Sequence, residues 1–260
     1  MSRGDIVLLH GAFVGGWMFE PLRAELSRRG WRTHAPDLPF HGSSFAGQPP
    51  HPELHNQRLA DYRRFLEDEI ARLPQQPVLV GHSMGGLLAQ QLAARGLARA
   101  AVLLAPVAPW GLLPHSLGEV AGPAGLLMKT GSLWHKALAP DFAMAAEYSL
   151  VRVPPARQRD IFARLVPESG HALFEMLLWW MDWHAGSHVS AHRVKIPLLV
   201  LSGDDDRVTP AATCRAVAGR YRGHAVYREI AGLGHFIFGE PKEADVIGIV
   251  ADWLETHTAG

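Results

Sequence analysis

Short segments rich in apolar residues alternate along the chain with longer segments in which apolar residues recur at helical spacing. The short segments predict strands at residues 6–9, 31–35, 78–80, 101–104, 198–201 and 226–230. The longer segments predict helices at about 17–29, 54–73, 84–92, 211–220 and 243–257. Because most strand segments are apolar throughout, both faces of the sheet must be covered, as in parallel sheets. The pattern therefore predicts an α/β fold with a mostly parallel, doubly wound sheet.

The alternation breaks after the strand at 101–104. From Pro106 to about residue 194 no clean strand pattern occurs, and the composition shifts towards Trp, Met, Leu, Pro and His. We interpret 106–194 as a mainly helical cap, inserted into a core made of 1–105 and 195–260. At 260 residues the chain fits one α/β domain with an insertion better than two independent domains.

Composition and charge narrow the possible partners. Lys and Arg total 25, Asp and Glu total 25, and no block of like charges occurs. A nucleic acid or an anionic membrane surface is therefore not expected as the main partner. The apolar run at 6–9 is too short for a signal peptide or a membrane span. The lone Cys214 suits a reducing compartment, so we expect a cytoplasmic protein, monomeric or dimeric.

The most specific local pattern is Gly81-His82-Ser83-Met84-Gly85, which follows the strand at 78–80 and precedes an apolar helix. A serine that acts as a nucleophile must be presented on a sharp turn between strand and helix. Glycines at both ends let such a turn close, because they lack the Cβ atoms that would collide. The segment therefore predicts Ser83 as a catalytic nucleophile.

A serine nucleophile needs a base, which is expected on a loop after a later strand. His235 lies in a glycine-flanked loop after the last predicted strand, at 226–230. Loops at the carboxyl ends of parallel strands converge on one crevice, so His235 can reach Ser83. We therefore predict His235 as the residue that takes the proton from Ser83.

The base in turn needs an acid that holds its tautomer. Three adjacent aspartates, Asp204, Asp205 and Asp206, follow the strand at 198–201. We favour Asp206, because it stands four residues before Pro210, which opens the next helix. Asp204 or Asp205 could serve instead.

The oxyanion that forms during acyl transfer needs hydrogen-bond donors already in place. One expected donor is the backbone N–H of Met84, immediately after the nucleophile at the start of its helix. The other is expected from the loop after the first strand, most readily the N–H of Ala12.

Several motifs in this order resemble the α/β-hydrolase fold superfamily, in its serine esterase and lipase-like branch. They are His10-Gly11-Ala12, Trp17, Asp37-Leu38-Pro39, His41-Gly42-Ser43-Ser44, Gly81-His82-Ser83-Met84-Gly85-Gly86, Gly203…Asp206…Pro210 and Gly234-His235. The resemblance implies ester hydrolysis through an acyl-enzyme, no cofactor, and a cap. The two antiparallel strands that usually open that fold have little room before Ile6, so we expect a shortened sheet. The segment from His10 to Trp17 is also similar to that of the methylesterase and hydroxynitrile-lyase group.

Two weaker patterns could suggest other kinds of site, a dinucleotide-binding turn and a metal site. The glycines at 11, 15 and 16 follow a strand, but they lack the spacing of a dinucleotide-binding turn. His184, His188 and His192 recur every four residues, yet Gly186 and Ser187 interrupt that helix, so we expect no metal site there.

Large aromatic residues suggest an apolar substrate pocket. The candidates for its lining are Phe13, Trp110, Trp134, Trp179, Trp180 and Phe236. Packing of the cap onto the core explains the tryptophans equally well. The sequence thus predicts a serine hydrolase that acts on small esters with apolar acyl or alcohol parts. A cofactor-free perhydrolase, a carbon–carbon bond hydrolase, or a receptor-like binding protein with negligible turnover would need the same Ser83, Asp206 and His235.

Overall fold

Six parallel strands form the central sheet of the computed structural model, which describes residues 3–113 and 135–257. The strands are β1 (Asp5–Leu9), β2 (Arg32–His34), β3 (Val78–His82), β4 (Ala100–Leu104), β7 (Leu198–Gly203) and β8 (Ala225–Ile230), and their order is β2-β1-β3-β4-β7-β8. Every neighbouring pair in this sheet is parallel. The predicted α/β class with a mostly parallel, doubly wound sheet is confirmed.

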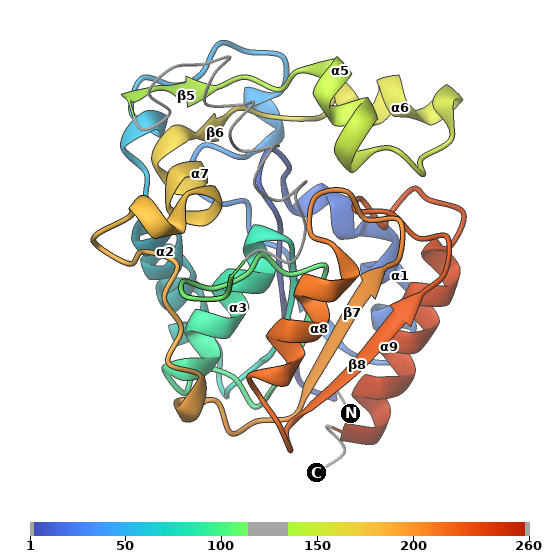
Figure 1. Ribbon diagram of the computed structural model, residues 1–260. Coiled ribbons are helices and arrows are strands. Elements are labelled where there is room, and N and C mark those ends of the chain that lie inside the picture. Colours follow the sequence, from blue (N-terminus) through green and yellow to red (C-terminus); the bar gives the residue numbers. More distant parts are fainter. Residues whose placement is uncertain (1–2, 114–134, 258–260) are drawn as a thin grey trace.

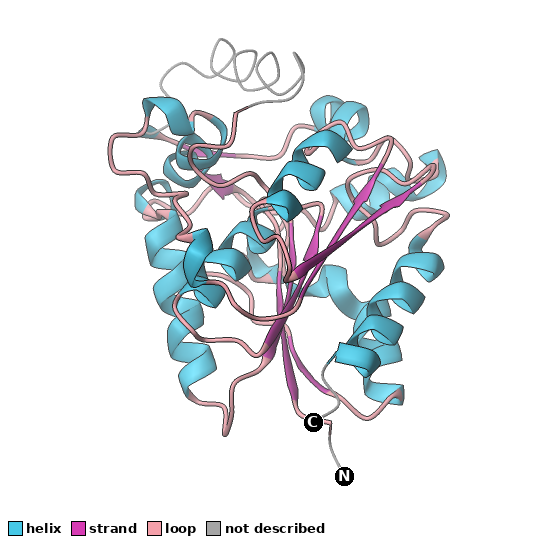
Figure 2. Cartoon of the chain, turned by 60° about the horizontal axis from the view of Figure 1, so that its bottom comes forward, coloured by secondary structure: helices cyan, strands magenta, loops and turns pink. Residues whose placement is uncertain are grey.

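Alternate side chains of the strands enter two separate cores, one on each face of the sheet. In β1, Ile6 and Leu8 belong to one core and Val7 and Leu9 to the other. Helices α1 (Glu20–Arg28) and α9 (Glu243–His257) cover the first face. Helices α2 (Leu59–Ala71), α3 (Met84–Ala94) and α8 (Ala211–Gly219) cover the second. Figures 1 and 2 show the sheet enclosed between these two layers.

The strand order reverses between β1 and β3, because the chain first places β2 on one side of β1 and then β3 on the other. Loops that leave the carboxyl ends of two such strands turn in opposite directions and leave a crevice between them. The register pairs Leu9 with Gly81, so the loops that begin at His10 and at Ser83 start side by side. The fold thus brings the two loops with predicted catalytic roles to one point.

We call the described residues between β4 and β7, 106–113 and 135–194, the cap segment. Its elements are β5 (Ala137–Leu138), α5 (Phe142–Met144), the π-helical turn η5 (Ala145–Ser149), α6 (Pro155–Phe162), β6 (Glu168–Ser169), α7 (Gly170–Leu177), η6 (Trp179–Met181) and η7 (Ala191–Arg193). Of these, β5, α5, α6, β6 and α7 lie over the carboxyl ends of the strands in Figure 1. The segment is mainly helical, although β5 and β6 pair as a two-residue antiparallel ribbon that the sequence pattern did not predict. Trp134 lies outside the described residues.

Three short 3₁₀ helices complete the core, and they are η1 (Gly16–Phe19), η2 (Ser43–Phe45) and η3 (Leu54–Asn56). The helix predicted at 54–73 is divided, because η3 ends at Asn56 before α2 begins at Leu59. Among the described helices, none is both long enough and apolar enough to cross a membrane.

Candidate active site

Ser83 occupies the turn between β3 and α3 with a left-handed backbone, φ 52° and ψ −117°. Its neighbours explain how the turn can exist. A Cβ on Gly81 would lie 2.2 Å from the carbonyl oxygen of Gly85, and one on Gly85 would lie 1.9 Å from that of Leu9. No L side chain fits either position, so both glycines are required by the close approach of strand and helix. A non-glycine residue in this backbone region stores about 1–3 kcal/mol of strain, which the packed surroundings must hold.

The structure brings Ser83, His235 and Asp206 together. His235 Nε2 lies 3.1 Å from Ser83 Oγ, and His235 Nδ1 lies 2.9 Å from Asp206 Oδ2. All three residues are buried. A carboxylate that accepts a hydrogen bond from Nδ1 keeps the ring proton on that nitrogen. The lone pair of Nε2 is then available to accept the proton of the serine hydroxyl. This geometry can activate a hydroxyl nucleophile.

The three neighbouring aspartates have different surroundings. Asp206 Oδ1 accepts hydrogen bonds from the backbone N–H groups of Val208 and Thr209, both at 2.8 Å, so its other oxygen faces His235. Asp204 instead accepts from the N–H of Gly232, and Asp205 is half-exposed beside Arg152. Only Asp206 among the three contacts the His235 ring in the structure.

The loop after β1 lies directly against Ser83, because a Cβ on Gly11 would lie 3.1 Å from Ser83 Cβ. Neither the N–H of Ala12 nor that of Met84 donates a hydrogen bond to another described residue. Met84 is the first residue of α3, where N–H groups have no partner within the helix. Both predicted donors are therefore free to bind a developing oxyanion.

His10 determines which way the Ala12 N–H points. The N–H of Leu38 donates to His10 Nε2 at 2.9 Å, so the proton of the neutral ring is on Nδ1, which donates to Gly11 O at 2.8 Å. Gly11 O and Ala12 N–H belong to one trans peptide unit and point in opposite directions. Burial lowers the pKa of His10 to about 3, so the ring stays in this neutral form.

The cap segment also hydrogen-bonds to the loop after β1. The N–H of Val166 donates to Phe13 O at 2.9 Å, and Phe13 has a left-handed φ of 64°. Two residues further on, Glu168 Oε2 lies 2.9 Å from His41 Nε2, and the hydroxyl of Tyr62 donates to Glu168 Oε1 at 2.7 Å. These contacts fix the start of β6 to the core.

His41 and Glu168 form an ion pair that is fully buried. Burial lowers the pKa of His41, but the Glu168 carboxylate outweighs burial, so the net pKa is raised. Burial raises the pKa of Glu168, yet His41, the Tyr62 hydroxyl and the Ser169 N–H together bring it below its usual range. The two pKa shifts therefore both favour the charged forms of the pair.

The predicted pocket residues separate into groups. Phe236 is buried, and its ring centroid lies 6.2 Å from that of Trp17. Trp179 contacts Trp110 and Trp180 edge-to-face, with centroid distances of 5.6 and 5.8 Å. The structure thus gathers these three tryptophans with one another.

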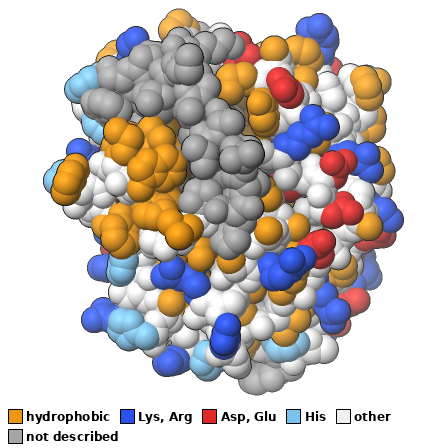
Figure 3. Space-filling view, viewed as in Figure 1, with side chains coloured by type: hydrophobic (Ala, Val, Ile, Leu, Met, Phe, Trp, Pro, Cys, Tyr) orange, Lys and Arg blue, Asp and Glu red, His pale blue; other side chains and the backbone are white. Residues whose placement is uncertain are grey.

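Several large apolar side chains of the cap segment are exposed at the surface. They are Trp110, Leu113, Trp180, Met181 and Trp183, of which Trp183 is 98% exposed. Figure 3 shows hydrophobic side chains gathered on the same side of the molecule as α7.

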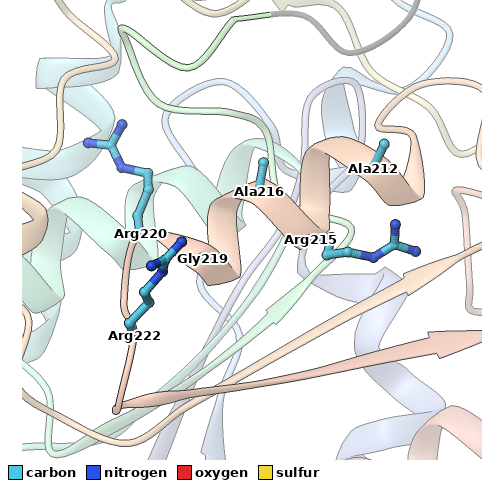
Figure 4. A pocket seen from close by; sticks show the side chains of 6 residues that line it. All are labelled: Ala212, Arg215, Ala216, Gly219, Arg220 and Arg222. Carbon is cyan, nitrogen blue, oxygen red and sulfur yellow. The ribbon is translucent and has the colours of Figure 1, made fainter.

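Two surface hollows lie away from the Ser83 group. The larger, about 580 Å³, follows the outer side of α8 and is lined by Ala212, Arg215, Ala216, Gly219, Arg220 and Arg222 (Figure 4). Arg215 pairs with Glu229, and Arg220 donates to Val189 O, so two of the arginines that line this hollow already have partners. The smaller, about 220 Å³, lies beside Phe174, Glu175 and Trp183. Within residues 3–113 and 135–257, no three His, Cys, Asp or Glu side chains are grouped to hold a metal ion.

Two residues that the sequence reasoning missed complete the site. Thr209 Oγ1 lies 3.0 Å from both Asp206 Oδ2 and Ala105 O, and 3.4 Å from His235 Nδ1. His82 Nε2 lies 2.8 Å from the carbonyl oxygen of His235. The spacing of Asp206 and Thr209, typical of a turn in which an aspartate caps following N–H groups, was a usable signal for the first. No local pattern revealed the second.

Comparison with known proteins gives the family that this chain matches. The family model described as "Alpha/beta hydrolase family" matches residues 6–244. A curated relative is the magnesium-chelatase 30 kDa subunit of Rhodobacter capsulatus, 26% identical over 96% of this chain and 86% of that protein. Another is the monoacylglycerol lipase of Mycolicibacterium smegmatis, 26% identical over 98% of this chain and 89% of the relative.

A solved structure is similar over nearly the whole chain. The monoacylglycerol lipase of Paleococcus ferrophilus superposes with a TM-score of 0.72 and 26% sequence identity. The superposition covers 98% of this chain and 95% of that one.

Proposed function

The chain belongs to the alpha/beta hydrolase family, and from this premise we propose that it is a serine hydrolase that cleaves carboxylic esters. The observation that carries the proposal is the continuous hydrogen-bonded arrangement from Ser83 Oγ through His235 to Asp206. Esterase and lipase names among the relatives support the same reaction class.

In the proposed reaction Ser83 Oγ attacks the acyl carbon, and its proton moves to His235 Nε2. Asp206 holds the Nδ1–H and stabilises the imidazolium, while the N–H groups of Ala12 and Met84 bind the oxyanion. The alcohol leaves with the proton from His235, and the acyl group remains on Ser83. Water then attacks the acyl-enzyme with His235 again as base, which releases the acid and restores the serine.

The substrate is proposed to carry an apolar acyl or alcohol part. The aromatic group of Trp110, Trp179 and Trp180 in the cap segment supports this, together with Phe13 on the oxyanion loop. Aromatic walls with few polar groups bind uncharged apolar ligands. A cytoplasmic location remains part of the same proposal.

The test is hydrolysis of p-nitrophenyl esters from acetate to laurate by wild type and by Ser83→Ala. We expect turnover by wild type that rises with acyl length to an optimum, and loss of turnover in Ser83→Ala by several orders of magnitude. A fluorophosphonate probe should label wild type at Ser83 and leave the variant unlabelled. A folded wild type without turnover on any ester would refute the proposal, and equal turnover by the variant would refute the role of Ser83.

A further inference from the structure

A second buried carboxylate serves the loop that carries His235. Glu240 Oε2 accepts a hydrogen bond from the N–H of Gly234 at 2.6 Å, and Oε1 accepts one from the N–H of Ile237 at 3.2 Å. These two N–H groups flank His235 on either side. The side chain is 4% exposed, so water does not replace these bonds.

The backbone of this loop is constrained on both sides of His235. Ile237 has a left-handed φ of 63°, which a β-branched residue adopts only under constraint. A Cβ on Gly234 would lie 2.9 Å from Glu240 Oε1, so the glycine before His235 is the residue that lets the carboxylate approach. Glu240 therefore hydrogen-bonds to both ends of the turn that holds the imidazole next to Ser83.

In its charged form, Glu240 also acts on His235. Burial raises the pKa of the Glu240 carboxyl above its ordinary value, while the two N–H donors and nearby His235 favour its charged form. The attraction is mutual, because a carboxylate that is stabilised by an imidazolium stabilises that imidazolium equally. Asp206 acts on the ring directly, whereas Glu240 acts through the loop and through its charge.

We propose that Glu240 is a positioning residue for His235, which holds the histidine loop through the N–H groups of Gly234 and Ile237 and supports the imidazolium formed during turnover. The inference rests on the proposed ester-hydrolase function. It adds a carboxylate that touches neither the substrate nor the imidazole ring.

The expected effect of removing the charge has two parts. Glutamine at 240 keeps one acceptor oxygen but faces the second N–H with an amide nitrogen, so one anchor of the loop is lost. The imidazolium also loses a neighbouring negative charge, which makes the imidazole a weaker base. The rate should therefore fall, while the acid limb of the pH–rate profile moves to lower pH. A role in folding alone would not move that limb.

Other charged and titratable groups near this loop bear on the pH profile. They are Asp206 and His82 beside the His235 ring, Asp204 at Gly232, Arg152 at Gly232, and Arg157 and Glu243 at Gly239. Glu243→Gln is the matched control, because it removes the negative charge at the start of α9, which contacts the loop at the N–H of Gly239 and not at Gly234 or Ile237.

The experiment measures kcat, KM and the pH profile of kcat/KM for wild type, Glu240→Gln, Glu240→Asp and Glu243→Gln on the best p-nitrophenyl ester. For Glu240→Gln we expect kcat about 10- to 100-fold lower with KM nearly unchanged. The acid limb should move to lower pH. Glu240→Asp keeps the negative charge, so its rate should fall while its acid limb stays at the wild-type pH. If Glu240→Gln does not fold, Glu240→Asp is compared with wild type in its place. Glu243→Gln should match wild type.

The rate of fluorophosphonate labelling at Ser83 gives the same comparison without an ester substrate. Wild type that labels but hydrolyses no ester would refute the proposed function while leaving Glu240 testable by its labelling rate. Wild-type kcat in Glu240→Gln would overturn the inference, and so would a loss of rate with an unmoved acid limb in that variant.

Discussion

His82 Nε2 donates a hydrogen bond to the backbone carbonyl oxygen of His235, 2.8 Å away. A carbonyl oxygen can only accept, so the proton of His82 is on Nε2. Its Nδ1 is buried and makes no hydrogen bond with a described residue. A second proton would place an unpaired charge there, and burial accordingly lowers the pKa of His82 to about 3. The residue before Ser83 thus secures the loop of His235 as a neutral imidazole.

This neutrality should make the fold sensitive to mild acid. His82 has a pKa of about 3 when folded and about 6.5 when unfolded, so its contribution is complete above pH 6.5 and is lost as pH falls towards 3. We expect the free energy of unfolding to depend less on pH in His82→Asn, by about 1.4 kcal/mol per pH unit between pH 4 and 6. Urea unfolding at several pH values measures the slope, and equal slopes would contradict the assignment.

Glu175 should destabilise the protein at alkaline pH. Burial raises its pKa to about 7, so above pH 7 the native state holds a buried carboxylate whose cost disappears as pH falls towards 4.5. We expect Glu175→Gln to be about 2 kcal/mol more stable than wild type at pH 8.5, and nearly equal to it at pH 5. Glu69→Gln, on the surface, should show neither effect. A gain that is the same at both pH values would exclude titration as its cause.

The acid of the site can be tested by three matched substitutions. Asparagine at 206 can still accept from the N–H groups of Val208 and Thr209, but it no longer holds His235 in the right tautomer. We expect kcat to fall by about 10³- to 10⁴-fold in Asp206→Asn. In Asp204→Asn and Asp205→Asn the change should stay within about tenfold. A larger loss in either of these two than in Asp206→Asn would assign the role to another aspartate.

Two glycines inside helices should respond to alanine in opposite directions. At Gly85 the new Cβ would lie 1.9 Å from Leu9 O and 2.6 Å from His10 O, and neither backbone atom can move away. We expect Gly85→Ala to lose at least about 3 kcal/mol of stability or to fail to fold. At Gly248, in α9, a Cβ meets no atom within 4 Å, so Gly248→Ala should gain about 0.5–1 kcal/mol. Thermal melting of both variants checks the pair.

The sequence reasoning succeeded where a feature is local or follows from strand order. The glycines around Ser83 and the positions of Asp206 and His235 after late strands sufficed to name three side chains that the structure places together. It failed where distant segments meet. His41 and Glu168 are 127 positions apart, and nothing near either residue indicates the other. The ribbon of β5 and β6 has only two residues in each strand, too few for a periodic pattern.

The hydrogen bonds at Val166, Glu168 and Ser169 have a consequence for engineering. Val166 supports Phe13, Glu168 pairs with His41, and Ser169 donates to Gln57 O at 2.5 Å. A graft that exchanged the whole insertion for that of a relative would therefore remove the hydrogen bond that supports the loop after β1, together with two contacts that tie β6 to the core. Libraries aimed at new substrates can vary the exposed tryptophans freely, but residues 166–169 must be inherited together with the core.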